Sequence, residues 1–328
     1  MSELSARSWV SAHLFYHAEQ DELIVGAVKP IVERLREAGL ADGFFFLRYW
    51  EGGPHVRLRV RTSADREQQV RSVIEDLAAA FYRISPSESL MSKEDYAESA
   101  PGLAKLEQMT DYDAVLHPDN SVAFIDYVAE TDVFGTGQAI DAVEKQLMAA
   151  SALAVEMIAR GRTPGQRAMD AFAMLAANRT LFTGILPELA YQARFLVESG
   201  GTAGEVLGSA EFENHFEANK AQLRGTVESV FAATRGVALP EASVASRWLT
   251  TVQDLTEKLV ELELLRTLDA FPSFDAPADV LEHINHLVPQ LIVERCAHLM
   301  FNRLGISLAQ ESHLRLLLTR TAFDLCAV

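Results

Sequence analysis

The segment from residue 43 to residue 62 constrains the fold more than any other part of this sequence. It reads GFFFLRYWEGGPHVRLRVRT. Two runs rich in β-forming residues flank the turn EGGP at 51–54, and alternating runs joined by a short connection with Gly and Pro are typical of a β-hairpin. The chain is therefore predicted to contain an antiparallel strand pair, and the rest of the fold has to build on it.

The register of this hairpin decides which face carries its charges. With residues 51–54 as the loop, Arg48 lies opposite Arg57. Alternation places Arg59 and His55 on the same face. Like charges directly opposite one another destabilise a strand pair by up to about 1 kcal/mol. Two interpretations stay open: a solvated face whose arginines pair with surface carboxylates, or a partly buried face, favoured by its aromatic side chains, whose guanidinium groups bind carboxylates or peptide carbonyls.

The order of the other elements around the hairpin indicates an α+β fold. Strand, helix, two strands, helix, strand is the split βαβ, ferredoxin-like arrangement, here with an insertion before the last strand. Pro30 should kink the first helix. The predicted elements are a strand at 9–16, a helix at 20–38 that ends at Gly39, a helix at 64–83, a short helix at 93–109 and a strand at 121–128.

After Gly137 the sequence is predicted to be helical. Ser307 with Gln310 forms a capping box for the last helix, and Gly305 caps the helix before it. No low-complexity linker is present, so we expect an α/β part at 1–137 and a helical part at 138–328 that pack together as one functional unit. The expected helices span about 138–160, 166–198, 203–234, 243–268, 277–304 and 308–326.

A second polar pattern lies in the helix predicted at 277–304. Glu294, His298 and Asn302 are spaced i, i+4, i+8 and form one polar stripe among apolar residues. A single histidine in such a helix is more often a core or rim residue than a catalyst. A histidine flanked by Glu and Asn is also the arrangement that fixes a tautomer for acid–base chemistry at neutral pH. The pattern itself does not decide between these roles.

Composition and motifs disfavour several classes of protein. The chain has 46 acidic and 29 basic residues, and its formal net charge of −17 disfavours non-specific binding to nucleic acid or to an anionic membrane. Only Cys296 and Cys326 occur and no leader or long apolar run is present, so we expect a cytoplasmic protein without structural disulfides. No metal-binding, P-loop or dinucleotide motif is present, and we expect no metal or cofactor. His283 and His286 with Glu282 mimic a metal site, but such a pair is more often at a helix surface.

Three stretches together resemble one known family. FFFLRYWEGGPHVRLRVR at 44–61 is similar to the FFIRY…HLRLR signature of the carboxy-terminal domain of lantibiotic dehydratases, also called the thiopeptide-type bacteriocin biosynthesis domain. CAHLMFNRLGIS at 296–307 resembles its HM..NRL.G signature, and residues 127–151 resemble a third, Y.PE..RYGG…AE..F..DS. The stretches lie in the family's order and cover nearly the whole chain.

The resemblance implies an enzyme that tailors a ribosomally synthesised precursor peptide, made of a leader and a modified core. In full-length lantibiotic dehydratases, Ser or Thr is glutamylated from glutamyl-tRNA, and this domain eliminates glutamate to leave dehydroalanine or dehydrobutyrine. Free-standing relatives either perform that elimination for a separate glutamylating dehydratase subunit, or join two dehydroalanines in a formal [4+2] cycloaddition. The cycloaddition makes the pyridine core of thiopeptides and releases the leader. A third role is a subunit that binds the precursor without catalysis.

The resemblance also suggests which residues form the site. The family's RYGG arginine falls on Val133, so one arginine that could hold the carboxylates of a leaving glutamate is missing, and this departure favours cycloaddition over elimination. Glu294 or Asn302 would orient the imidazole of His298. We expect catalysis by His298, Arg48 and Arg57, and substrate binding by Arg59, His55, Trp50, Glu294, Asn302 and Arg303.

Overall fold

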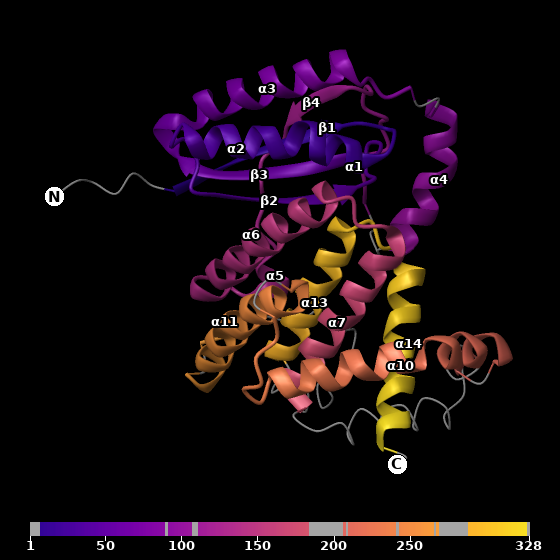
Figure 1. Cartoon of the computed structure of the whole chain (residues 1–328). Coiled ribbons are helices and arrows are strands. Elements are labelled where there is room, and N and C mark those ends of the chain that lie inside the picture. The colour runs from indigo at the N-terminus through magenta and orange to yellow at the C-terminus, as the bar shows by residue number, and fades with distance from the viewer. Residues whose placement is uncertain are drawn as a thin grey trace. The chain divides into compact units, whose positions relative to one another are not determined.

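The computed structural model describes residues 7–88, 91–106, 111–183, 206–207, 209–240, 243–265, 267–268 and 288–326 (Figure 1). The chain divides into two compact units. Unit 1 comprises residues 1–129 and 147–161, and unit 2 comprises residues 130–146 and 162–328. This division differs from a single boundary at residue 137, because helix α6 (Gln138–Ala159) begins in unit 2 and ends in unit 1.

Unit 1 is built on a four-stranded sheet in the order β2-β3-β1-β4. Each neighbouring pair is antiparallel, and β3 lies between β1 and β2, which confirms the ferredoxin-like prediction. The last strand is shorter than predicted. The strands are β1 (Arg7–Phe15), β2 (Gly43–Tyr49), β3 (His55–Ser63) and β4 (Ser121–Phe124).

Helices cover one face of this sheet (Figure 1). A π-helical stretch, Ile24–Val28, immediately precedes the helix that contains Pro30. Proline lacks the N–H that would close the α-helical turn, so the irregularity lies where the kink was predicted. The helices are α1 (Gln20–Leu23), α2 (Lys29–Glu37) and α3 (Glu67–Ile84), and α4 (Lys93–Leu106) lies in the insertion before β4. The core of unit 1 includes fully buried Val10, Ala12, Leu14, Ile31, Val56, Leu58, Val60, Val70 and Ile74.

The hairpin loop is one residue longer than predicted. Tyr49 pairs with His55, so the loop spans residues 50–54. Gly52 and Gly53 both adopt positive φ, 76° and 109°, a conformation that glycine reaches without a Cβ clash. The register expected from the sequence, with residues 51–54 as the loop, is therefore wrong by one residue.

The corrected register places Arg48 on the opposite face from Arg57. Arg48 pairs with Val56, and Arg57 pairs with Leu47. Phe46 shares the face of Arg48 and is fully buried there, and burying a phenylalanine side chain contributes about 1.5–3 kcal/mol. The register that would pair the arginines loses this burial, because a one-residue slip turns every side chain to the other face. The face that carries Arg57, Arg59 and Arg61 is called the arginine face below.

The second half of α6 belongs to the fold of unit 1. Its residue Ser151 is fully buried, and the Ser151 hydroxyl oxygen accepts a hydrogen bond of 3.1 Å from the backbone N–H of Phe46 in β2. β2 is one of the two edge strands of the sheet, so this N–H, which no neighbouring strand can reach, finds a partner on the helix.

Unit 2 is helical in the part that the structure describes. Helix α7 contacts α10, α11, α13 and α14, and its residues 171–178 are buried. Parts of the helices predicted at 166–198, 203–234 and 277–304 lie outside the described residues. The helices are α5 (Thr131–Phe134), α7 (Pro164–Thr183), α10 (Ala210–Ala233), α11 (Val244–Leu264), α13 (Val288–Arg303) and α14 (Leu308–Cys326).

The turn between α13 and α14 has the predicted caps. Gly305 adopts φ 73° just after α13, and Ile306 N–H donates to Phe301 O over 3.0 Å. Ser307 and Gln310 exchange hydrogen bonds at the start of α14. These caps fix where α14 begins, and they confirm the predicted capping box.

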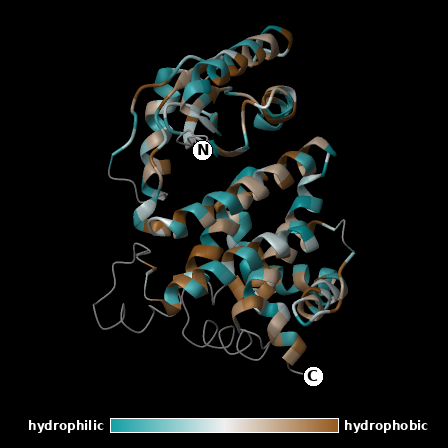
Figure 2. Ribbon diagram, turned by 90° about the vertical axis from the view of Figure 1, so that its left-hand side faces the viewer, coloured by the Kyte–Doolittle hydropathy of each residue, from teal (hydrophilic) through white to brown (hydrophobic). Residues whose placement is uncertain are grey.

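Hydrophilic and hydrophobic residues mix along the helices of the chain (Figure 2). Among the described residues, no helix combines the length and the apolar character needed to cross a membrane. Within the same residues, no cluster of His, Cys, Asp or Glu is placed to hold a metal ion. The segment with His283, His286 and Glu282 lies outside them.

Candidate functional site

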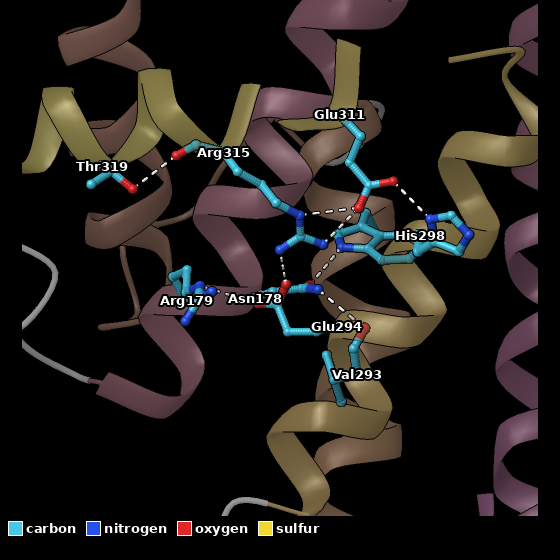
Figure 3. Close-up of polar contacts among 9 residues, drawn as sticks. Asn178, Arg179, Val293, Glu294, His298, Glu311, Arg315 and Thr319 are labelled. Atoms are coloured by element: carbon cyan, nitrogen blue, oxygen red, sulfur yellow. Dashed lines mark hydrogen bonds and ion pairs between the residues drawn. The ribbon is translucent and has the colours of Figure 1, made fainter. Parts of the chain in front are cut away.

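The imidazole of His298 is held by a carboxylate from the next helix. His298 Nδ1 lies 2.7 Å from Glu311 Oε2 (Figure 3). A carboxylate oxygen accepts, so Nδ1 carries a proton, and in the neutral imidazole Nε2 has the lone pair. No hydrogen bond among the described residues engages Nε2, and the side chain is 29% exposed. His298 therefore presents a basic nitrogen in a fixed tautomer.

Glu311 is buried and stays ionised. Burial raises the pKa of its carboxyl, but hydrogen bonds from His298 and Arg315, with their charges, outweigh burial and hold the pKa below its usual range. Arg315 donates to Glu311 Oε1 through Nε at 3.0 Å and Nη2 at 2.8 Å. Glu311 also lies in the first turn of α14, where the helix dipole favours a negative charge.

Glu294 has a different role from the one that the sequence suggested. Its Oε2 accepts from Arg315 Nη1 at 2.6 Å, and its Oε1 lies 3.3 Å from Arg179 Nε. The residue that binds Nδ1 of His298 is thus Glu311 of α14, one element further along the chain. The four side chains Glu294, Arg315, Glu311 and His298 form a continuous chain of hydrogen bonds across α13 and α14 (Figure 3).

A buried amide fixes the helices on which this chain of contacts rests. Asn178 of α7 is fully buried and accepts a 3.0 Å hydrogen bond from Trp248 Nε1 of α11. Its amide nitrogen donates to the carbonyl of Val293 in α13 at 3.3 Å. The side chain of Asn178 thus joins α7, α11 and α13. Its contact with α13 is at Val293, the residue before Glu294.

In unit 1, Arg57 lies in a cage on the arginine face. Its guanidinium carbon is 3.3 Å from the ring centroid of Tyr49. Its Nη2 donates to Glu51 Oε2 at 2.7 Å, and its Nε donates to His55 Nε2 at 3.3 Å. Nη1 has no hydrogen-bond partner among the described residues, and the side chain is 20% exposed. Arg57 is therefore oriented by three neighbours and keeps one amino group available.

Both ring nitrogens of His55 are already bonded. Nδ1 donates to the carbonyl of Gly53 at 2.8 Å, and Nε2 accepts from Arg57. Burial is the main cause that lowers the pKa of His55 to about 3. A neutral, fully buried imidazole with two partners suits the holding of Arg57 rather than the contact with substrate expected from the sequence.

Arg48 is bound to helix α1 on the other face of the sheet. Its Nη2 forms an ion pair with Asp21, and its Nη1 lies 3.8 Å from Glu19. The like-charge pair of Arg48 and Arg57 that the sequence suggested does not form. Arg48 thus bonds locally to acidic residues of the helix layer.

The other predicted binding residues lie in varied settings. Arg59 is buried on the arginine face, with Tyr127 at 5.8 Å from its guanidinium carbon. Trp50 is half-buried and stacks on Tyr49 at 6.2 Å. In unit 2, Asn302 is half-buried, one turn beyond His298. Arg303 is fully buried, and burial lowers its pKa to about 9.

Position 133, where the family signature has arginine, lies in the short helix α5. Val133 is half-buried and the adjacent Phe134 is buried. Just before α5, Glu130 lies 3.9 Å from Arg295 of α13. Arg295 is therefore a cation close to the start of α5. It comes from α13, whereas the arginine of the family signature would stand at position 133.

Sequence reasoning missed Glu311 and Glu51. The predicted capping box at Ser307 places Glu311 in the first turn of α14, and this was the signal for a carboxylate close to the end of α13. Glu51 was assigned only to a turn, although its carboxylate binds Arg57 and the backbone N–H of Asp113 at 2.8 Å. The expectation that the two parts of the chain act as one functional unit stays a prediction.

The comparisons with known proteins give a family and a fold. A family model described as the carboxy-terminal part of the lantibiotic biosynthesis dehydratase matches residues 9–322. No protein of curated function matches the sequence.

Three solved structures are similar to this chain. The pyridine synthase TbtD from thiomuracin biosynthesis has a TM-score of 0.75 and 21% identity, over 97% of this chain and 99% of that one. TsrL has a TM-score of 0.63 and 16% identity, over 98% and 96%. The tRNA-dependent lantibiotic dehydratase MibB from Microbispora sp. 107891 has a TM-score of 0.53 and 17% identity, over 100% of this chain and 29% of its own. At these identities the likeness is one of fold.

Proposed function

The chain belongs to the family of lantibiotic dehydratase carboxy-terminal domains, and from that premise we propose that it is a tailoring enzyme of a thiopeptide-type precursor peptide. Its proposed reaction is the formal [4+2] cycloaddition of two dehydroalanines that forms the pyridine core. The likeness of fold to a pyridine synthase along nearly the full length of both chains supports this proposal.

The observation that carries the proposal is the tautomer of His298. Its Nδ1 is held by Glu311, and its Nε2 has no protein partner among the described residues. A neutral imidazole with one free lone pair can act as a general base and then return the proton. The buried, ionised carboxylate of Glu311 fixes the orientation of this imidazole.

The proposed reaction needs such a proton shuttle. His298 Nε2 takes the N–H proton of one peptide amide and returns it to the carbonyl oxygen of that amide, which gives the iminol and a 2-azadiene. Two σ bonds then form between the azadiene and the second alkene as their π bonds are used. The former iminol hydroxyl leaves as water and the leader peptide leaves as a carboxamide. Each departure takes one ring hydrogen, and the ring becomes aromatic.

Arg57 is the proposed binding group for a peptide carbonyl of the substrate. Its Nη1 is available, while Tyr49, Glu51 and His55 fix the guanidinium plane. A preorganised donor polarises an amide carbonyl without first having to reorder. In this proposal His55 and Glu51 are positioning residues, and Arg48 contributes to stability.

Val133 favours cycloaddition over elimination. A leaving glutamate presents two carboxylates, and an arginine that could bind them is replaced here by an apolar side chain. The arginine face favours the alternative, glutamate elimination for a separate glutamylating subunit, because guanidinium groups suit carboxylates. A subunit that only binds the precursor is disfavoured by the oriented imidazole of His298.

Mass spectrometry with two substrates tests these functions. Purified protein receives a glutamylated precursor in one reaction and a dehydrated, azole-bearing precursor in another. We expect a pyridine macrocycle and a leader carboxamide from the dehydrated peptide, and an unchanged glutamylated peptide. Release of glutamate without ring formation would show that the protein catalyses glutamate elimination instead of cycloaddition. Binding of both peptides without either product would indicate the non-catalytic subunit.

A further inference from the structure

Two polar residues of β1 lie beside the arginines of β3. Ser11 pairs with Arg59, and His13 pairs with Arg57. Directly paired residues of neighbouring strands point to the same side of a sheet, so Ser11 and His13 belong to the arginine face. Neither residue belongs to the stretches that carry the family resemblance.

Both side chains are buried with polar atoms that lack partners. Ser11 is 3% exposed and His13 is 4% exposed. In the part of the chain that the structure describes, the Ser11 hydroxyl oxygen and His13 Nε2 have no hydrogen-bond partner. Most buried polar side-chain atoms in proteins are bonded, so two neighbouring exceptions on one face need an explanation such as a ligand.

The imidazole of His13 is neutral and fixed by stacking. Its ring lies 4.8 Å from that of His55, at an interplanar angle of 19°. Burial, followed by the positive charges nearby, lowers the pKa of His13 to about 2. His55 has no ring nitrogen left for a ligand. His13 is therefore the imidazole of this pair that can bond to another molecule.

The local charge favours a neutral oxygen as the ligand atom. Glu51 lies 2.7 Å from Arg57 and offsets its charge. A carboxylate placed at Arg57 would meet the like charge of Glu51, whereas an amide carbonyl would not. Ser11, His13 and Arg57 together offer a hydroxyl, a neutral imidazole and one guanidinium amino group.

We propose that Ser11 and His13, with Arg57, form a subsite that binds backbone amide carbonyls of the modified core peptide. The identity of the peptide rests on the proposed function, while the preference for an amide oxygen rests on the groups of this face. Arg57 is the part of the subsite with the most exposed side chain, and it lies next to His13. A peptide that bonds to Arg57 Nη1 through one carbonyl and runs beside β1 would bring further backbone carbonyls to the unbonded atoms of His13 and Ser11.

The test separates a ligand subsite from a structural cluster. Ser11→Ala and His13→Phe keep the shape of each side chain, and the phenyl ring keeps the stacking on His55. Fluorescence anisotropy measures the binding of the dehydrated core peptide and of the glutamylated peptide, and urea unfolding measures stability. Ser8→Ala is the matched control, because it removes a hydroxyl from the same strand on the opposite face, where Ser8 bonds to Glu67.

We expect each variant to bind the dehydrated peptide about tenfold more weakly, and to unfold at the same urea concentration or a higher one. Apolar groups of the same shape remove buried atoms that had no partner. Ser8→Ala should bind the dehydrated peptide as tightly as the wild-type protein does. Equal binding by all variants, a loss of stability that accounts for the loss of binding, or an unchanged protein that binds neither peptide would overturn the subsite.

The glutamylated peptide distinguishes the two kinds of oxygen. A selective loss of binding to that peptide in the variants would show a carboxylate site and contradict the amide preference. Ring formation by the unchanged protein is scored separately. A protein that binds the dehydrated peptide through Ser11 and His13 but forms no ring would refute the proposed reaction and leave the subsite standing.

Discussion

Glu311 binds Nδ1 of His298 at 2.7 Å and is itself bound through its other oxygen by Arg315. The carboxylate of Glu311 is therefore held in place by Arg315, and it in turn holds the imidazole of His298 in place. The orientation of His298 depends on α14 as much as on α13, the helix that carries it.

Glu311→Gln should lower kcat for ring formation by about 10- to 100-fold, with little change in KM. The replacement loses a charge-assisted hydrogen bond, of about 1.5–3 kcal/mol, and lets an amide N–H face Nδ1, which favours the wrong tautomer. Steady-state kinetics by mass spectrometry measure both constants. Glu311→Asp should retain more activity, and Glu257→Gln, on the exposed side of α11, is the matched control. An unchanged kcat would remove Glu311 from the mechanism.

Arg48→Gln should mainly reduce stability, whereas Arg57→Gln should mainly reduce activity. Arg48→Gln breaks the contacts with Asp21 and Glu19 and should lower the free energy of unfolding by about 1–3 kcal/mol, with normal kcat for the folded fraction. Arg57→Gln should slow ring formation with a smaller effect on stability. Urea unfolding and kinetics of the same preparations give both values. Loss of activity in Arg48→Gln without loss of stability would show that Arg48 acts on substrate.

The free energy of unfolding should fall as the pH decreases from about 6.5. Burial lowers the pKa of His13 to about 2 and that of His55 to about 3, while an unfolded histidine titrates near 6.5. Between these values the unfolded chain binds more protons than the folded one, so stability is full above about 6.5 and is lost on acidification.

His13→Phe should reduce this acid sensitivity. The difference in unfolding free energy between pH 8 and pH 5 should shrink by up to about 2 kcal/mol, the value for one histidine over one and a half pH units. Urea unfolding at the two pH values measures it. An unchanged difference in His13→Phe would show that His13 is not buried in its neutral form.

Asn178→Leu should destabilise the protein by about 2–5 kcal/mol. The leucine leaves Trp248 Nε1 and the carbonyl of Val293 without their partner, and each buried group that loses its hydrogen bond costs about 1–3 kcal/mol. Thermal unfolding measures the loss. Asn214→Leu, at an exposed position of α10, is the control. A melting temperature equal to that of the unchanged protein would mean that this amide does not hold the three helices together.

Local sequence patterns predicted the strands and helices of the chain. A one-residue error in the length of the hairpin loop, however, placed Arg48 on the wrong face of the sheet. The strand and helix order, the cap at Gly305 and the capping box at Ser307 depend on neighbouring residues, and they could be predicted. The side of the sheet that carries Arg48 depends on where Phe46 is buried, which is a tertiary effect. The contact between His298 and Glu311 spans two helices, so periodicity within one helix favoured Glu294 instead.

The bond between Ser151 and Phe46 limits how this protein can be divided. A fragment that stops at residue 137 keeps every strand of the sheet but loses the helical segment that covers β2. The bared edge would offer its unpaired N–H and C=O groups to any extended chain, and such edges promote aggregation. A gene cut between the sheet and the helices should therefore yield insoluble protein, whereas a fragment that retains residues up to 161 keeps its edge protected.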